Sequence, residues 1–417
     1  MDSFYFAALT LAHLFHLRGR TAASTTTTAT LASEEDNPRF LFAAAVRREP
    51  STFPLSARWL AAAHAPGRPL KYSLRGSTFA SGLRPLAPAL WLELDPCPRR
   101  LRRELLLKRA LLDRGGPFFR TVVAAEGGTE GAQGGALRLV LSALRGSPAH
   151  ALLGAGGAPW DGEGDPLEAV DAVRVLPTGD EHALRHWRDA PLALAALLVQ
   201  EDFILLRRAP RGAQRHAGAY VFVAGAACFS FSEVGLRGER GNMTLGEPMG
   251  GIHAAVPHFA AKMAAGIARV FDGLREGEGG GMYRANWGLA PSGTLSPFEP
   301  EIEDPSRPPH AFSRASAGEG VVYAVRDAHP SALWLKVEHQ TVHRVPVGEG
   351  AEPLVLFTVR TYADPLPAVV SHGAAGAAAA AVLADAIESL TPEQLAYRDL
   401  SDGPARARLL SYLRGGR

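Results

Sequence analysis

The sequence predicts an α+β fold in which a strand-rich centre is flanked by helices. Residues 333–345 and 354–362 alternate between apolar and polar side chains, as strands with one face in a core do. Residues 99–114 carry leucines at helical spacing, and this run ends at Gly115. Residues 374–390 are rich in alanine, which favours a helix. The strands therefore stand between helices in the sequence.

The other elements follow in chain order. Residues 193–199 suit a helix that runs into a strand at residues 203–208, and residues 220–231 are rich in β-forming side chains. Residues 258–274 fit a further helix. Residues 391–394, TPEQ, supply an N-cap threonine, a proline at the first helical position and a capping-box glutamine. We therefore expect a last helix to begin there.

Glycine marks the expected loops. The chain contains 44 glycines and 31 prolines, and residues 126–135 and 154–164 are especially rich in glycine. We expect both segments to be loops that pack little. Residues 154–159, GAGGAP, lack the GxGxxG pattern and the Lys-Ser/Thr ending of nucleotide-binding loops, so we assign them no ligand.

The first residues are predicted to be a leader, residues 1–38, ahead of one domain at residues 39–417. Residues 4–17 are apolar, but His13 and His16 interrupt them, and the run is shorter than the about 20 residues that span a membrane. A Ser/Thr-rich tract without acidic residues follows. The leader is therefore typical of a disordered segment or a transit peptide, with a weak membrane anchor as the alternative. We expect the protein to be soluble, in the cytoplasm or an organelle.

Charge and cysteine content argue against several classes of protein. The sum of Lys and Arg is 44 and that of Asp and Glu is 42, so the net charge of +2 gives no long-range field for nucleic acid. Two cysteines, Cys97 and Cys228, are too few for CxxC zinc sites or a disulfide framework, and we expect both to be reduced. The basic residues of the helix at 99–114 are expected to form a solvated face, with docking of an acidic electron-transfer partner as the alternative. They are Arg99, Arg100, Arg102, Arg103 and Lys108.

Seven short motifs occur in order along the chain. They are GLRPL at residues 82–86 with Trp91, VQEDFILL at 199–206, ACF at 227–229, LGEPMGGIHAAVP at 245–257, YRANW at 283–287, KVEHQTVHRVP at 336–346 and FTVRTY at 357–362. Together they resemble the haem-binding alpha subunit of haem-dependent oxidative N-demethylases, and VLADAIESL at 382–390 extends the resemblance. Residues 230–233, SFSE, depart from the Pro-Ser-x-Trp pattern of that family and bear on which amine is accepted.

The resemblance implies a PAS-like antiparallel sheet that binds haem b with its iron and is elaborated by flanking helices. It also implies a monooxygenase that uses O2 to oxidise an N-methyl group of a secondary or tertiary methylamine, giving the demethylated amine and formaldehyde. The resemblance further implies that a separate flavin and iron–sulfur reductase delivers the electrons. The sequence shows no dinucleotide fingerprint or four-cysteine cluster, so an enzyme of this kind needs a partner. A PAS-like haem sensor or carrier is the alternative, because fold does not fix function. A pseudoenzyme that has lost haem is the third reading.

A haem iron needs an axial ligand, for which His, Cys, Met and Tyr are the ordinary choices. The resemblance favours His253 in the IHAAVP motif, where apolar neighbours would keep water from the iron. His339 and His343 are the rivals. They share one strand face and form a potential metal pair without an evident third ligand. A thiolate at Cys228 is a further alternative.

Haem propionates favour arginine partners, because the guanidinium fork matches a carboxylate. Arg284, Arg344 and Arg360 each lie in a different motif and are the candidates. Each can instead join a structural ion pair with Glu338 or Glu201, and both interpretations stay open.

A methylamine is cationic at neutral pH, so its site needs a carboxylate or an aromatic wall. The candidates for binding the amine are Glu201, Asp202 and Tyr283. The candidate catalytic residues are Glu338, Asn286, as a hydrogen-bond donor to the oxygen substrate, and Trp287, for which a place in the core is the alternative.

Overall fold

The structure is a computed structural model, and the residues that it describes are 82–88, 91–92, 94–95, 98–212, 215–229, 245–254, 256–276, 280–296, 298–299, 302, 325–346, 354–371 and 373–415. All of them belong to the unit that spans Pro38–Arg417. The predicted leader, Cys97 and the divergent residues 230–233 lie outside the described residues.

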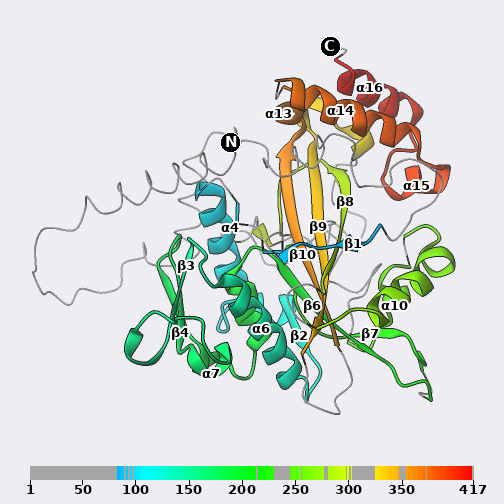
Figure 1. Ribbon diagram of the computed structural model, residues 1–417. Helices are drawn as coiled ribbons and strands as arrows, with labels where there is room; N and C mark the ends of the chain where they lie inside the picture. Colours follow the sequence, from blue (N-terminus) through cyan, green and yellow to red (C-terminus); the bar gives the residue numbers. More distant parts are fainter. Residues whose placement is uncertain are drawn as a thin grey trace, which may run out of the picture. The chain divides into compact units, whose positions relative to one another are not determined.

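A seven-stranded sheet forms the centre of the described chain (Figure 1). Its strand order is β1-β8-β9-β10-β6-β7-β2, and every neighbouring pair is antiparallel. The longest strands, β9 (Trp334–Val345) and β10 (Leu354–Pro365), pair with each other over their whole length. The remaining strands are β1 (Arg84–Pro85), β2 (Val123–Ala125), β6 (Asp202–Arg208), β7 (Tyr220–Ala226) and β8 (Met282–Ala290).

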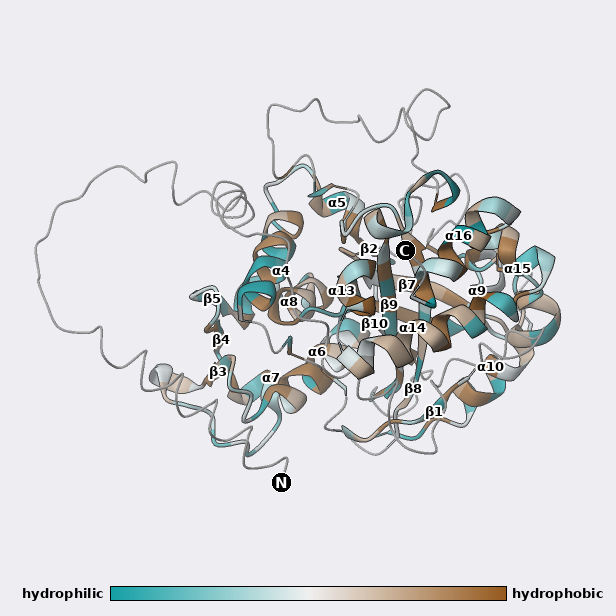
Figure 2. Cartoon of the chain, turned by 90° about the horizontal axis from the view of Figure 1, so that it is seen from above, coloured by the Kyte–Doolittle hydropathy of each residue, from teal (hydrophilic) through white to brown (hydrophobic). Residues whose placement is uncertain are grey.

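Helices lie against both faces of this sheet (Figures 1 and 2). On the face that we call the α4 face, Leu354 and Leu356 of β10 share a core with three helices, α4 (Pro98–Leu111), α6 (Glu130–Leu144) and α8 (Pro191–Leu198). On the opposite face, the α10 face, Val355 packs with α9 (Met249–Ile252), the π-helical turn Phe259–Met263 and α10 (Ala264–Asp272). Because strand side chains alternate, a residue's position in β8, β9 or β10 determines which face it occupies.

The C-terminal helices form a third core at one end of the sheet. Trp287, Val337 and Tyr362, one from each central strand, pack there against Leu366 and Leu409. The helices are α13 (Leu366–Val370), α14 (Gly373–Glu388), α15 (Pro392–Tyr397) and α16 (Gly403–Leu413). The predicted capping box is present at the start of α15, where the side chains of Thr391 and Gln394 bond each other's backbone N–H.

A small three-stranded antiparallel sheet, which the sequence did not predict, lies apart from the main one. Its strands are β3 (His150–Leu153), β4 (Ala172–Val175) and β5 (Asp180–Ala183). Short elements among the described residues include α5 (Phe119–Val122), α7 (Pro166–Ala169) and the 3-10 turns Ala155–Gly157, Leu184–Trp187, Val325–Asp327 and Pro330–Ala332.

The predicted α+β class is confirmed. Helices or strands overlap every segment for which the sequence predicts one: 99–114, 193–199, 203–208, 220–231, 258–274, 333–345, 354–362, 374–390 and the helix that begins after residue 391. The loop predicted at residues 126–135 is wrong in its second half, because α6 begins at Glu130. Gly135 explains why glycine is used there: a Cβ at that position would lie 2.6 Å from the carbonyl oxygen of Pro346. The glycine permits close approach of α6 to the end of β9.

The solvated basic face predicted for the helix at 99–114 is also wrong for two of its residues. Lys108 and Arg100 of α4 are buried, with 0% and 6% of their surface exposed. Both form ion pairs with carboxylates in the protein interior, so α4 uses these cations to attach to the sheet.

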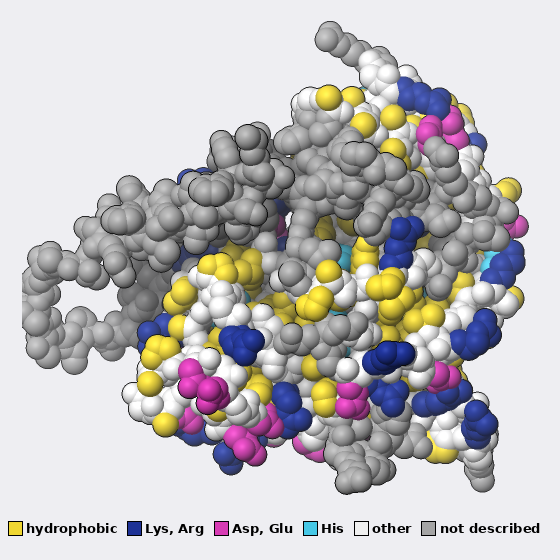
Figure 3. All heavy atoms as spheres, in the orientation of Figure 1, with side chains coloured by type: hydrophobic (Ala, Val, Ile, Leu, Met, Phe, Trp, Pro, Cys, Tyr) yellow, Lys and Arg dark blue, Asp and Glu magenta, His cyan; other side chains and the backbone are white. Residues whose placement is uncertain are grey.

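Two further observations concern the surface and the membrane. On the face drawn in Figure 3, Lys and Arg side chains and Asp and Glu side chains are both scattered, with hydrophobic side chains between them. Within the described part of the chain, no helix has the length and apolar character that crossing a bilayer requires.

Candidate functional site

A cluster of polar side chains lies on the α10 face of β8 and β9. Asn286 pairs with Glu338 across the two strands, and Arg284 pairs with Gln340. Because strand side chains alternate between the two faces, these four residues lie on the same face as Val342, which packs in the core of the α10 face. The register of two antiparallel strands therefore brings together three residues that the sequence analysis selected and one, Gln340, that it missed.

Glu338 is the acidic centre of this cluster and is 9% exposed. Its Oε2 atom accepts hydrogen bonds from Gln340 Nε2 at 2.7 Å and from Asn286 Nδ2 at 3.4 Å. Burial raises the pKa of the Glu338 carboxyl, while these two hydrogen bonds and the charges of Arg284 and Arg398 oppose that rise. Among the described residues nothing hydrogen-bonds Oε1, so one carboxylate oxygen is held and the other is available to a ligand.

Arg398, directly after α15, reaches the cluster from the C-terminal helices. Its guanidinium donates to the carbonyl oxygen of Trp287 and, at 3.3 Å, to Asn286 Oδ1. It also lies 4.2 Å from the centre of the Trp287 ring, within the range of a cation–π contact. Burial lowers the pKa of Arg398 to about 10, with a smaller lowering from the like charge of Arg284. The contacts with Trp287 and Asn286 hold the guanidinium in place.

His253 follows α9 on the same face of the sheet. Its Nδ1 atom lies 2.8 Å from the carbonyl oxygen of Met249, and its ring stacks on Phe259 at 4.3 Å between centroids and 8° between planes. A carbonyl only accepts, so Nδ1 carries the proton and Nε2 of the neutral ring keeps its lone pair. Burial, followed by the charge of Arg284, lowers the pKa of His253 and favours that neutral form. No described residue hydrogen-bonds Nε2.

Arg284 connects His253 with the polar cluster, because its charge acts on both His253 and Glu338. Burial lowers the pKa of Arg284, and the described residues provide it with no hydrogen bond and no ion pair within 4.0 Å. Arg344 lies on the same face, four residues beyond Gln340 and thus roughly 13 Å along β9. It also lacks such a partner among the described residues. Two cations on this face are therefore available to anionic groups.

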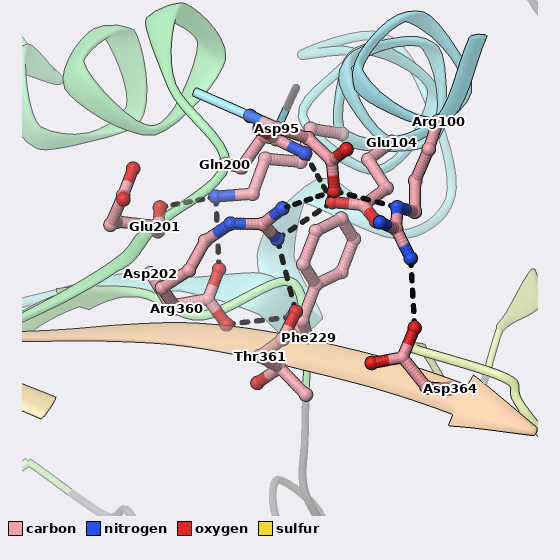
Figure 4. Close-up of polar contacts among 11 residues, drawn as sticks. Asp95, Arg100, Glu104, Gln200, Glu201, Asp202, Phe229, Arg360, Thr361 and Asp364 are labelled. Atoms are coloured by element: carbon pink, nitrogen blue, oxygen red, sulfur yellow. Dashed lines mark hydrogen bonds and ion pairs between the residues drawn. The ribbon is translucent and has the colours of Figure 1, made fainter. Parts of the chain in front are cut away.

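Arg360, in contrast, lies on the α4 face in a buried ion network (Figure 4). It is completely buried, 2.7 Å from Glu104 Oε2 and 3.6 Å from Asp95 Oδ2. The same network includes Arg100, which pairs with Asp95 at 2.6 Å and with Asp364 at 3.0 Å. The sequence left open whether Arg360 binds a propionate or forms a structural ion pair, and its geometry corresponds to the ion pair. Its main partner is Glu104, and not Glu338 or Glu201 as the sequence suggested.

Glu201 and Asp202, the predicted amine-binding pair, belong to the same buried region (Figure 4). Lys108 donates to the carbonyl oxygen of Glu201 and lies 3.1 Å from Asp202 Oδ1. Asp202 Oδ2 also accepts from the backbone N–H of Phe229 at 2.7 Å. Both residues are at most 2% exposed, and their contacts attach α4 to the start of β6. The structure does not bring them into the cluster around Glu338.

The rival histidines and Tyr283 also point to the α4 face. His343 packs on Trp91 at 4.1 Å, and His339 packs near Tyr283 at 5.6 Å. Burial and the neighbouring His339 lower the pKa of His343 to about 3. Two side chains four residues apart on a strand are separated by roughly 13 Å at their Cα atoms, too far to form a metal pair. No group of three potential metal-ligand side chains exists among the described residues.

Trp287 and Cys228 both belong to cores. Trp287 is 2% exposed and packs with the C-terminal helices, while its ring and carbonyl support Arg398. Cys228 is completely buried, and burial, assisted by the charge of Asp202, raises the pKa of its thiol well above the usual range. Cys228 packs in the core of the α4 face, whereas the cluster around Glu338 lies on the α10 face.

Gln340 and Arg398 are the residues that the sequence analysis missed. Gln340 has a detectable signal, since it lies two residues after Glu338 in the same motif and must share its strand face. The sequence contains no signal for Arg398, because only the packing of the C-terminal helices brings this residue to β8.

Two comparisons with known proteins bear on this site. A family model described as haem-dependent oxidative N-demethylase, alpha subunit-like, matches residues 82–403. No curated protein matches the chain.

Proposed function

The chain belongs to the haem-dependent oxidative N-demethylase, alpha subunit-like, family, and on that premise we propose that it is a monooxygenase that demethylates a secondary or tertiary methylamine. The proposed products are the demethylated amine and formaldehyde. The proposed co-reactants are O2 and electrons from a separate flavin and iron–sulfur reductase. A PAS-like character of the sheet is part of the same proposal.

The residues of the α10 face fit a haem b group. His253 offers an Nε2 lone pair beside apolar side chains of the same core, among them Met249 and Phe259. Arg284 and Arg344 form no hydrogen bond and no ion pair within 4.0 Å with the described residues, and their positive charges suit two propionates. His253 would hold the iron, the two arginines would hold the propionates, and haem bound there would supply the activation of oxygen.

Glu338 is the residue that we assign to the amine. Its free Oε1 atom can accept a hydrogen bond from an alkylammonium N–H, a charge-assisted contact worth about 1.5–3 kcal/mol net. Asn286 gives one amide hydrogen to Glu338 and keeps the other for a second oxygen atom at the site. Burial raises the pKa of Glu338, which suits a group that moves the proton from the hydroxylated methyl group to nitrogen.

The observation that carries the proposal is the free Nε2 of His253 on the same sheet face as the half-satisfied Glu338 carboxylate. The test is an optical titration of haem-loaded protein with a panel of methylated amines and with neutral molecules of the same shape. We expect methylated amines alone to shift the haem spectrum and, with a reductase and O2, to yield formaldehyde in proportion to the electrons consumed. Full haem binding with no response to any amine would favour the sensor or carrier instead.

A further inference from the structure

A continuous hydrogen-bonded series joins the C-terminal helices to the carboxylate in the cluster. Arg398 donates to Asn286 Oδ1, Asn286 Nδ2 donates to Glu338 Oε2, and Gln340 Nε2 donates to the same oxygen. Arg398 comes from beyond α15, while the other three residues come from β8 and β9. The series therefore crosses from one core of the protein to another.

The direction of each bond follows from the chemistry of Arg398. A guanidinium donates and never accepts, so the amide oxygen of Asn286 must face Arg398 and its NH2 group must face Glu338. If the Asn286 amide were turned by 180°, its NH2 group would face the guanidinium of Arg398 and its oxygen would face the carboxylate of Glu338. Both hydrogen bonds of the amide would then be lost. Arg398 therefore determines which end of the Asn286 amide faces the carboxylate of Glu338.

We propose that Arg398 is a positioning residue for amine binding, a role that rests on the proposed function. By fixing the Asn286 amide, it holds Glu338 through Oε2 and leaves Oε1 as the acceptor for the substrate ammonium. The Trp287 ring and carbonyl hold the guanidinium in place, and the backbone N–H of Arg398 donates to Gln394 of α15 at 3.1 Å. The C-terminal helices are therefore a part of the amine site and not only a cover for the end of the sheet.

The test compares Arg398→Gln and Arg398→Lys with the wild-type chain, using dimethylamine as the ligand. Affinity is measured by calorimetry and by optical titration of the haem-loaded protein, and thermal stability is measured beside it. The matched control is Arg326→Gln, which removes an exposed arginine that pairs with Asp399, the residue next to Arg398, at 2.9 Å.

We expect Arg398→Gln to weaken dimethylamine binding by about tenfold, which corresponds to about 1.4 kcal/mol, while the Soret band keeps its position. Arg398→Lys restores part of this loss, because a single ammonium cannot reproduce both arms of the guanidinium fork. Arg326→Gln leaves the affinity unchanged. If Arg398→Gln does not fold, the lysine variant alone carries the test, and wild-type affinity in that variant overturns the proposal.

A double variant separates positioning from a merely structural role. If Arg398 acts through Asn286, then Asn286→Ala and Asn286→Ala with Arg398→Gln weaken dimethylamine binding equally, by about tenfold, instead of about a hundredfold together. Additive losses would overturn the proposal, as would an unchanged affinity in Arg398→Gln. A wild-type chain that binds haem but no methylated amine would overturn the proposed function itself, and the inference with it.

Discussion

The Nδ1 atom of His253 lies 2.8 Å from the carbonyl oxygen of Met249, one helical turn earlier in the chain. This bond fixes the tautomer of the ring and orients its Nε2 lone pair, in the way that backbone carbonyls hold histidines that bind metals. His339 lies on the opposite face of the sheet, near Tyr283.

We expect His253→Ala to lose the Soret band of the haem-loaded protein or to change its spin state, because the iron loses its axial ligand. His339→Ala is the control, and we expect its spectrum to match that of the wild type. Absorption spectra of the two purified variants with added haem provide the measurement. The reverse pattern would move the ligand to β9.

Arg284 is expected to contribute to haem affinity but not to stability, because it has no ion pair or hydrogen bond with the described residues. Losing one charge-assisted contact with a propionate costs about 1.5–3 kcal/mol, so Arg284→Gln should weaken haem binding at least about tenfold. Haem titration and thermal unfolding of the apoprotein measure the two effects. A large fall in melting temperature with unchanged haem affinity would assign Arg284 to the fold instead.

Arg360 should behave in the opposite way. Arg360→Met leaves Glu104 buried without its closest cation, and breaking a buried pair in this manner costs about 3–5 kcal/mol. Denaturant unfolding of the apoprotein measures this loss. The control, Arg114→Met, breaks an exposed pair with Asp189 and should cost less than about 1 kcal/mol. If Arg360→Met weakened haem binding while leaving stability intact, the structural assignment would be refuted.

The contrast between Arg284 and Arg360 illustrates what the sequence can and cannot predict. Both arginines lie in motifs, and the sequence left open whether each binds an anion or forms a structural pair. The decision depends on the partner that folding supplies. For Arg360 this is Glu104, 256 residues away in the chain, which no local pattern connects with it.

Local periodicity predicted the strands β9 and β10 well, because alternation is a property of the segment itself. It failed at α6, where Gly135 is read as a loop signal although the helix uses it to approach β9 closely. The pairing of Asn286 with Glu338 could be expected only after the register of β8 and β9 was known. A sequence shows which side chains of a strand share a face, but it does not show the register of that strand with its neighbour.

His150 should make stability depend on pH. Burial lowers its pKa from 6.5 to about 4, so the folded chain keeps this ring neutral at a pH where the unfolded chain protonates it. Its contribution is therefore complete above about pH 6.5 and declines as the pH falls towards 4. We expect it to remove about 2 kcal/mol of the free energy of unfolding between about pH 7.5 and pH 5.

Denaturant unfolding of the wild type and of His150→Gln at these two pH values isolates this histidine from the others. The glutamine does not titrate and can still meet Leu198 O, which His150 Nε2 contacts at 2.6 Å. A pH dependence that is equally steep in the variant would mean that other groups produce it.

Glu338→Gln should separate charge from shape in amine recognition. The substitution keeps the size of the side chain but removes the negative charge that an alkylammonium would meet at Oε1. We expect dimethylamine binding to weaken at least about tenfold, the equivalent of losing one charge-assisted hydrogen bond, while haem binding is unchanged. Optical titration of the haem-loaded variant measures both quantities in one experiment.

Glu388→Gln is the matched control, since Glu388 pairs with Arg414 at an exposed position and we expect that variant to bind dimethylamine as the wild type does. Dimethyl ether, neutral and similar in shape, should bind the wild type and Glu338→Gln equally weakly, because it brings no N–H to the carboxylate. Equal dimethylamine affinity in Glu338→Gln and the wild type would show that recognition of the amine lies elsewhere on the chain.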